Sequence, residues 1–213
     1  MKTRALLVPC VCWLAFTTGC ALLTKATPTV PRYFSPERPE ASAAVAPSST
    51  RGLSVRMGRV GGGSYLKERM AFRDSDHEFG FYEDRRWTER PEVYLERALE
   101  TTLYEQRGVK RALAQSAPTL TADLVEFEEV KGSAPRVRLR VSYALHDETT
   151  VFLERTLAVE RPLPSGDDAT QPDRVAAALG DALDEAVKRI DDEVIAALGA
   201  STAKTVSQPP TTR

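Results

Sequence analysis

Apolar and polar residues alternate most regularly in the stretch RVRLRVSYAL, residues 136–145. One side of this stretch is entirely apolar or aromatic: Val137, Leu139, Val141, Tyr143 and Leu145. The opposite side begins with three arginines. A period of two predicts a β-strand with one buried face. The stretch TTVFLERTLAVE repeats the pattern after the short turn HDET, so we expect an antiparallel hairpin.

Three further segments are predicted to be strands: LSVRMGRV (residues 53–60), EFGFYEDRRW (78–87) and TLTADLVEFEEV (119–130). In the last of them, Leu120, Ala122 and Leu124 share one side, whereas Phe127 falls out of phase. A shift of this kind predicts a β-bulge or a change of register.

Two amphipathic helices complete the pattern. The first, PEVYLERALETTLYEQRG, has Pro91 in its first turn and Gly108 at its end, which are favoured positions for these residues. The second begins near Pro172 and repeats apolar residues at steps of three and four as far as Leu198. We therefore predict an α+β fold: a single two-layer domain with a mostly antiparallel sheet of about five strands and both helices on one face.

The N-terminus has a different character. Ala5 to Phe16 form an apolar run of about a dozen residues, which is too short for a spanning helix of roughly twenty. Lys2 and Arg4 precede the run, and the small residues 17–19 follow it. This arrangement is typical of a secretory signal, and we assign residues 1–19 to it.

The signal ends in Gly19-Cys20, which resembles the lipobox of bacterial lipoproteins, although Thr17 stands where that motif usually has Leu. Cleavage before Cys20 would remove Cys10 and Cys12 and leave one unpaired cysteine. Acylation of Cys20 explains this leftover residue. The alternative is an ordinary secretory signal followed by an incidental cysteine.

Composition divides the remaining chain into three parts. Residues 20–50 are rich in Pro, Ala, Ser and Thr and are predicted to be a tether, with a reach of roughly 90 Å at ~3.1 Å per residue. Within it, the piece Arg32–Glu37 has two aromatic residues that suit local docking. Residues 51–200 have the size of one domain, and residues 201–213 are predicted to be a disordered tail.

Charge and motifs argue against several functions. The 29 basic and 30 acidic residues give a formal net charge of −1, so no footprint for nucleic acid is visible. The Gly-rich stretch 58–68 lacks the spacing of a phosphate-binding loop. His77 and His146 lie in separate predicted turns, which does not indicate a metal site. No nucleophile and base are brought together, so we predict a protein that is not an enzyme and has no cofactor.

The corner between the strand 78–87 and the first helix contains Arg85, Arg86 and Trp87. Trp87 is the only tryptophan after the predicted signal. Its indole could fill the corner between sheet and helix, which is a structural role. The alternative is that the three residues form a partner interface, where Arg and Trp are enriched.

At these residues the chain resembles the ABC-type transport auxiliary lipoprotein family, to which the lipoprotein encoded with the paraquat-inducible MCE system belongs. The shared features occur in the same order along almost the whole mature chain: the lipobox Cys20, the pair Tyr33-Phe34, LSVRMGRV, YLKERMAFR (Tyr65–Arg73), RRWTERP (Arg85–Pro91), and the helix pattern Leu95, Ala98-Leu99 and Leu103. Each motif is weak alone, and their order carries the resemblance.

The resemblance implies a non-catalytic lipoprotein that assists an MCE-type ABC transporter in moving lipids through the cell envelope. Its implied partners are an MCE-domain protein and the outer membrane, which it would enter through acylated Cys20 while facing the periplasm. Ala21, rather than Asp, after the acylated cysteine favours the outer membrane. A ring-forming homo-oligomer is one assembly that the resemblance allows.

Two other classes of function stay open at this point. A structural or assembly lipoprotein of another outer-membrane complex would have the same anchor, tether and α+β domain. An envelope enzyme would need a concave site with converging polar groups.

Overall fold

The structure is a computed structural model that describes residues 29–37, 50, 52–114, 116–164 and 171–206. The chain divides into two compact units, Met1–Val30 and Pro31–Arg213. The description below concerns the second unit, and the predicted signal and Cys20 lie outside the described residues.

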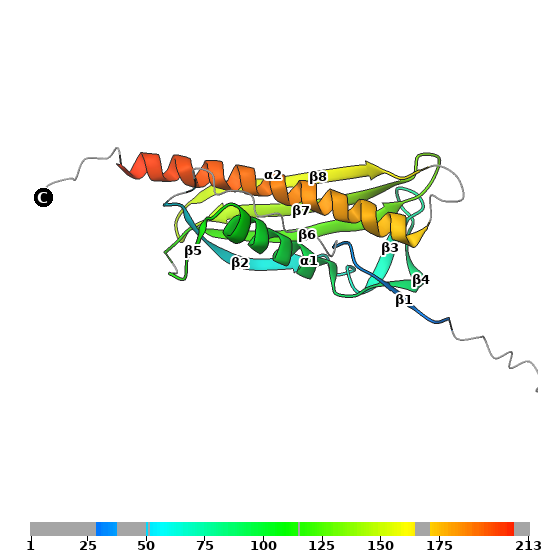
Figure 1. The fold of residues 1–213 in the computed structure, drawn as a ribbon. Coiled ribbons are helices and arrows are strands. Elements are labelled where there is room, and N and C mark those ends of the chain that lie inside the picture. Colours follow the sequence, from blue (N-terminus) through cyan, green and yellow to red (C-terminus); the bar gives the residue numbers. More distant parts are fainter. Residues whose placement is uncertain (1–28, 38–49, 51, 115, 165–170, 207–213) are drawn as a thin grey trace, which may run out of the picture. The chain divides into compact units, whose positions relative to one another are not determined.

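Eight strands and two α-helices are found in the described residues (Figure 1). The strands are β1 (Arg32–Phe34), β2 (Ser54–Gly62), β3 (Arg69–Arg73), β4 (Phe79–Trp87), β5 (Lys110–Arg111), β6 (Thr119–Val130), β7 (Arg136–His146) and β8 (Val151–Pro162). The helices are α1 (Pro91–Glu100), which continues into the π-helix η1 (Thr101–Gln106), and α2 (Pro172–Val206).

The predicted α+β class with two helices is confirmed, but the sheet has eight strands rather than the predicted number of about five. The eight strands form one mixed sheet, in which β1–β4, β2–β5, β2–β6 and β3–β6 are parallel pairs. The three strands that were missed, β1, β3 and β5, are two to five residues long. Strands this short leave too few positions for a period of two to be recognised.

Strand β6 organises the sheet. One of its edges pairs with β7 along the whole strand, and β7 pairs in turn with β8, which confirms the predicted hairpin. The other edge is shared: β2 pairs with the first half of β6, and β3 pairs with its end. The predicted change of register is confirmed between Leu124 and Glu126, at the point where the strand changes from one partner to the other.

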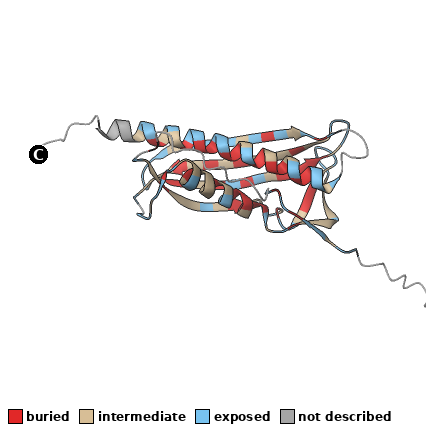
Figure 2. Cartoon of the chain, viewed as in Figure 1, coloured by how far each residue is buried: buried red, intermediate tan, exposed pale blue. Residues whose placement is uncertain are grey.

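Both helices cover the same face of the sheet, with α2 over β7 and β8 and α1 over β2 (Figure 1). The apolar side of β7 is buried beneath α2, and Val137, Leu139, Val141 and Leu145 are fully inaccessible. Buried and exposed residues alternate along α2, as expected for a helix with one apolar face (Figure 2). We call this side of the sheet the helix face and the other side the open face.

The ends of the first helix follow from its sequence. Pro91 occupies the first turn after the extended residue Arg90. The helix then widens into η1 and ends at Gly108, whose φ of 68° is a conformation that glycine adopts without strain. The predicted glycine stop is therefore confirmed.

The folded unit is longer than the predicted domain 51–200. Strand β1 pairs with β4, which confirms local docking of Arg32–Glu37, and α2 continues to Val206. Residues 21–31 alone therefore separate Cys20 from β1. At ~3.1 Å per residue these eleven residues reach roughly 34 Å, much less than the 90 Å expected for an uninterrupted tether.

Length alone does not make α2 a membrane helix. It has 35 residues, and charged residues recur along it from Asp173 to Glu193. Within the described part of the chain, no helix is both long and apolar enough to cross a membrane.

Candidate functional site

The predicted interface residues lie where β1 joins the sheet. The parallel register places Arg32 opposite Arg85, Tyr33 opposite Arg86, and Phe34 opposite Trp87. Phe34 and Trp87 are buried on the helix face. Because neighbouring residues of a strand point to opposite sides, Tyr33 and Arg86 share the open face.

Trp87 is a core residue. Its side chain is 1% exposed, and its ring packs against those of Phe127 and Tyr94, with centroids 5.2 and 6.4 Å away. The backbone N–H of Trp87 donates to the carbonyl oxygen of Glu68 at 2.6 Å. The indole therefore fills the corner between the sheet and α1, and its surface is not available to a partner in this fold.

Tyr94 links this corner to the start of α1. Its hydroxyl accepts a hydrogen bond from the backbone N–H of Glu89 and bonds to the hydroxyl of Thr88, both at 2.8 Å. The N–H of Thr88 donates to the carbonyl oxygen of Phe34 at 2.9 Å. One aromatic residue thus holds together the helix start, the preceding loop and β1.

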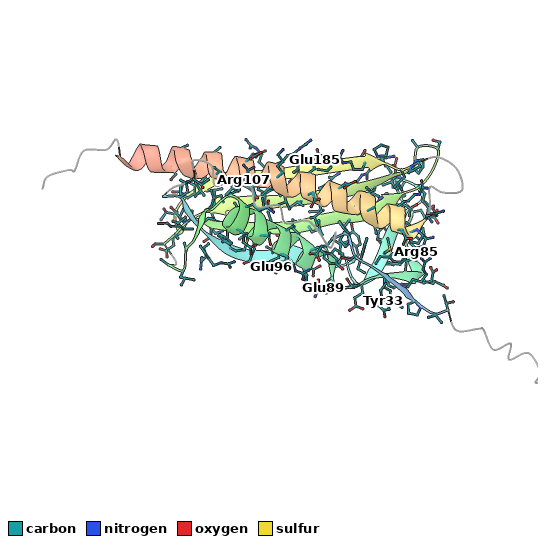
Figure 3. The ribbon with its side chains drawn as sticks, viewed as in Figure 1. Tyr33, Arg85, Glu89, Glu96, Arg107 and Glu185 are labelled. Carbon is teal, nitrogen blue, oxygen red and sulfur yellow. The ribbon has the colours of Figure 1, made fainter. Side chains whose placement is uncertain are left out.

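Arg85 also faces inward. Its guanidinium lies 3.8 Å from the centroid of the Tyr82 ring, and its side chain is 16% exposed. The Tyr82 hydroxyl donates to buried Glu129 at 2.8 Å. Burial, followed by this hydrogen bond, raises the pKa of Tyr82. Figure 3 shows Arg85 and Tyr33 close to β1, at the end of the sheet formed by β1 and β4.

Of the three predicted interface residues, Arg86 alone lies on the open face. Across the sheet it is paired with Tyr33 of β1 on one side and Arg69 of β3 on the other. Tyr33 is 62% exposed. Among the described residues, the half-buried side chain of Arg86 makes no hydrogen bond or ion pair.

The open face around Arg86 carries several aromatic and arginine side chains, which we call the aromatic–arginine patch. Its members are Tyr33, Tyr65, Arg69, Phe79, Phe81 and Arg86. Three of the rings meet edge to face: the centroid of Phe79 lies 4.8 Å from that of Tyr65 and 5.0 Å from that of Phe81. The Arg69 guanidinium lies 5.6 Å from the Phe81 ring. Tyr, Phe and Arg are the side chains enriched in protein interfaces.

The patch has a rigid base. Below it, the fully buried carboxylate of Glu128 accepts a hydrogen bond from the Arg73 guanidinium at 2.7 Å, and this bond raises the pKa of Arg73. The Tyr65 hydroxyl donates to the carbonyl oxygen of Val125 at the bulge of β6, at 2.9 Å. The bulge therefore helps to orient a patch residue, which is a frequent role of bulges.

The arginines of β7 form a different kind of surface. Glu160 lies 2.8 Å from Arg138 and 3.1 Å from Arg136, and Glu126 lies 3.1 Å from Arg140. The hydrogen bond from Arg138 lowers the pKa of Glu160. Each of the three arginines has an ion pair within the sheet, so the two glutamates balance most of the charge of the row.

Other sequence candidates have structural explanations. The Gly-rich stretch begins within β2, and a β-carbon at Gly62 would come within 2.8 Å of the buried carboxylate of Glu92. That glycine therefore accommodates a side chain packed against the strand. Within the described ranges, no three His, Cys, Asp or Glu side chains gather as a metal site requires.

Sequence reasoning missed part of the patch. The sequence predicted a strand over residues 78–87, but it did not predict that Phe79 and Phe81 lie on the open face. Tyr65 and Arg69 were not singled out because Tyr65 lies in a turn and β3 is too short to show a period. The available signal was that aromatic residues and arginines recur together between residues 65 and 86.

Comparison with known families shows the family to which the chain belongs. The sequence profile of the ABC-type transport auxiliary lipoprotein component family matches residues 36–191, which is most of the 213-residue chain. The chain belongs to this family. A comparison with curated proteins gives no significant match.

Solved structures share the fold of this family member. A crystal structure of a Xanthomonas campestris protein assigned to the DUF330 family is 19% identical, with a TM-score of 0.67 over 81% of this chain and 99% of that one. A crystal structure of an uncharacterized protein is 15% identical, with a TM-score of 0.59 over 78% and 99% of the two chains. At these identities the likeness shows the fold alone.

Proposed function

We propose that this auxiliary lipoprotein is anchored in the outer membrane through Cys20 and is a non-catalytic partner of an MCE-type ABC transporter that moves lipids through the periplasm. Its family membership supports a role as an auxiliary transport component. The match of residues 1–20 to a signal followed by a lipobox cysteine supports the anchor.

The observation that carries the proposal is the aromatic–arginine patch. The patch combines Tyr33, which is 62% exposed, with rings that meet edge to face and with Arg86, which we take to offer its charge on the open face. A pre-formed group of aromatic and arginine side chains resembles the centre of protein interfaces, where a few such residues provide most of the binding free energy. We assign the patch to the transporter partner, and retain Arg85 and Trp87 as residues that position it.

The short connection to the membrane supports the same arrangement. Only eleven residues, 21–31, lie between the acylated cysteine and the start of β1 in the sequence. The transporter partner would therefore have to come close to the outer membrane to be bound, as a bridge between two membranes requires.

The anchor is tested by Cys20→Ser in the natural host. Three acyl chains hold a protein stably on a bilayer, whereas a chain without them has no comparable attachment. We expect the variant to fold, to retain its thermal unfolding transition, and to fractionate with the soluble periplasmic proteins. Fractionation with membranes, as for the wild type, would contradict the anchor.

The partner is tested by affinity capture of the wild-type lipoprotein from detergent-solubilised envelopes, followed by identification of the captured proteins. We expect an MCE-domain protein with its permease and ATPase. Capture of a different outer-membrane complex, and no MCE-domain protein, would favour a structural or assembly lipoprotein.

A further inference from the structure

A groove runs between the two helices, on the side of the molecule opposite the aromatic–arginine patch. Its volume is about 490 Å³, which lies in the range of small-molecule sites. One wall comes from α1 and η1 and the other from α2. The lining residues are Ala98, Thr102, Gln106, Arg107, Asp184, Val187 and Lys188. Figure 3 shows Arg107 where the end of η1 approaches α2.

The shape of the groove has a local cause. Ala98, Thr102 and Gln106 are spaced by four residues, so they line one side of the α1–η1 helix, and their short or slender side chains leave space beside α2. The backbone changes from α to π geometry at Thr101, within this wall. Such π-turns occur frequently at functional sites.

The chemistry of the groove is asymmetric along its length. Ala98 and Val187 provide an apolar floor. Arg107 and Lys188 add cationic groups, and Arg107 is fixed by an ion pair with Asp192 of α2. In the described residues Lys188 has no ion pair, so its ammonium group can bind an anion, although Asp184 lies on the same wall.

Asp191 strengthens this asymmetry. It follows Val187 by one helical turn, is fully buried, and has no hydrogen-bond partner on either carboxylate oxygen among the described residues. Burial raises its pKa to about 8, with nearby Arg107 opposing the shift and Asp192 adding to it. Near neutral pH the Asp191 side chain therefore holds a proton and adds no negative charge beside the groove.

We propose that this groove binds an acyl chain that ends in an anionic head group, with the chain along Ala98 and Val187 and the head group at Arg107 and Lys188. Phospholipids and fatty acids share this chemistry. The inference rests on the proposed function in lipid transport and adds to it a direct contact with lipid. A metal ion does not suit the groove because its walls include two cationic side chains.

The test uses the mature chain, residues 20–213, carrying Cys20→Ser so that no acyl group of its own is present. Binding of dioctanoyl phosphatidylglycerol and of laurate is measured separately by isothermal calorimetry. Val187→Trp fills the groove, Lys188→Glu reverses the free cation, and Ala177→Trp adds the same ring at an exposed position of α2 as a control. Thermal unfolding is recorded for all variants.

We expect the wild type and Ala177→Trp to bind equally and Val187→Trp to lose binding. Lys188→Glu should bind at least about tenfold more weakly, and because Lys188 is exposed this variant tests the groove even if Val187→Trp does not fold. Binding of the phospholipid but not laurate identifies a phospholipid site; the reverse identifies a fatty-acid site.

The proposal is overturned if neither compound binds the wild type, or if Lys188→Glu binds as well as the wild type. Capture of the MCE-domain protein is measured with the same Lys188→Glu variant. A wild type that binds neither compound but still captures its partner would remove the groove proposal and leave the proposed function intact. A wild type that binds lipid but captures no MCE-domain protein would remove the proposed function and leave the groove proposal intact.

Discussion

The two faces of the sheet use charge and apolar surface in opposite ways. On the helix face, β7 presents Val137, Leu139, Val141 and Leu145, all fully buried under α2. On the open face, the same strand presents arginines that pair with glutamates of β6 and β8. The comparison shows which surface differs: beyond the paired arginines of β7, the open face carries the rings of Tyr65, Phe79 and Phe81, which meet edge to face, and Arg86, which has no counter-ion in the described residues.

The difference between the faces predicts which substitutions disturb folding and which disturb binding. Substitutions of residues that face the helices should lower the free energy of unfolding strongly. Substitutions on the open face should change it little. Within the aromatic–arginine patch, substitutions should instead lower the amount of partner that is captured.

The largest effect is expected for Trp87→Ala. Removing a buried ring that packs against Phe127 and Tyr94 should lower the free energy of unfolding by ~3–5 kcal/mol, measured by denaturant titration. The control is the adjacent Arg86→Ala on the open face, for which we expect a change within ~0.5 kcal/mol. Similar losses for both variants would contradict the assignment of the two residues to opposite faces.

Gly180→Ala tests how the N-terminal segment is held on the helix side. A β-carbon at Gly180 of α2 would collide with the backbone carbonyl oxygen of Pro36, and we expect a loss of ~1–3 kcal/mol in thermal unfolding. Gly199 lies in the same helix, and a β-carbon there would meet no described atom within 4 Å, so Gly199→Ala should instead stabilise by up to ~1 kcal/mol. Stabilisation by both substitutions would show that Pro36 does not contact α2.

Asp191 makes the stability of the helix side dependent on pH. Its pKa is about 8 in the folded state and about 4 in an unfolded chain, so the folded state holds the extra proton between these values. The free energy of unfolding should therefore fall as pH rises from about 4 to about 8, by up to ~1.4 kcal/mol per pH unit near neutrality.

Urea titrations at several pH values measure this slope. Asp191→Asn should reduce it strongly, whereas Asp192→Asn, at the exposed neighbour that adds only a smaller part of the pKa shift, should reduce it slightly. Equal slopes in the wild type and Asp191→Asn would show that Asp191 does not carry the proton.

The smallest effect is expected on the open face. Glu160→Gln removes ion pairs with Arg136 and Arg138, but the Glu160 side chain is 45% exposed, so the loss should be about 0.5 kcal/mol and should decrease with added salt. Because the folded-state pKa of Glu160 is lowered, its contribution is present near neutral pH and is lost on acidification. A loss above ~2 kcal/mol, unaffected by salt, would indicate that these pairs are buried in an assembly.

Much of the fold could be predicted because long elements repeat their pattern. The alternation in residues 136–145, the out-of-phase Phe127 and the terminal Gly108 each specified a feature that the structure contains. The short strands β1, β3 and β5 could not be predicted, because their pairing depends on distant partners rather than on a local period.

The candidate site could be predicted only in part. The sequence indicated the corner at Arg85–Trp87, but β4 has an irregular register next to it, and this decides which of the three residues face outward. Tyr33 reaches the site through a parallel pairing across more than fifty residues of chain. The resemblance predicted the family of the chain, which the local pattern of residues alone could not. The profile match over residues 36–191 confirms this prediction.

The central claim is that the aromatic–arginine patch binds the transporter partner, and Arg86→Glu tests it most directly. The measurement is the amount of MCE-domain protein captured by the lipidated variant from solubilised envelopes, at matched lipoprotein concentration. The control is Arg155→Glu, the same change at an exposed residue of β8. We expect Arg86→Glu to lower capture at least about tenfold, with unchanged unfolding, while Arg155→Glu captures normally. Equal capture by both variants would contradict the claim.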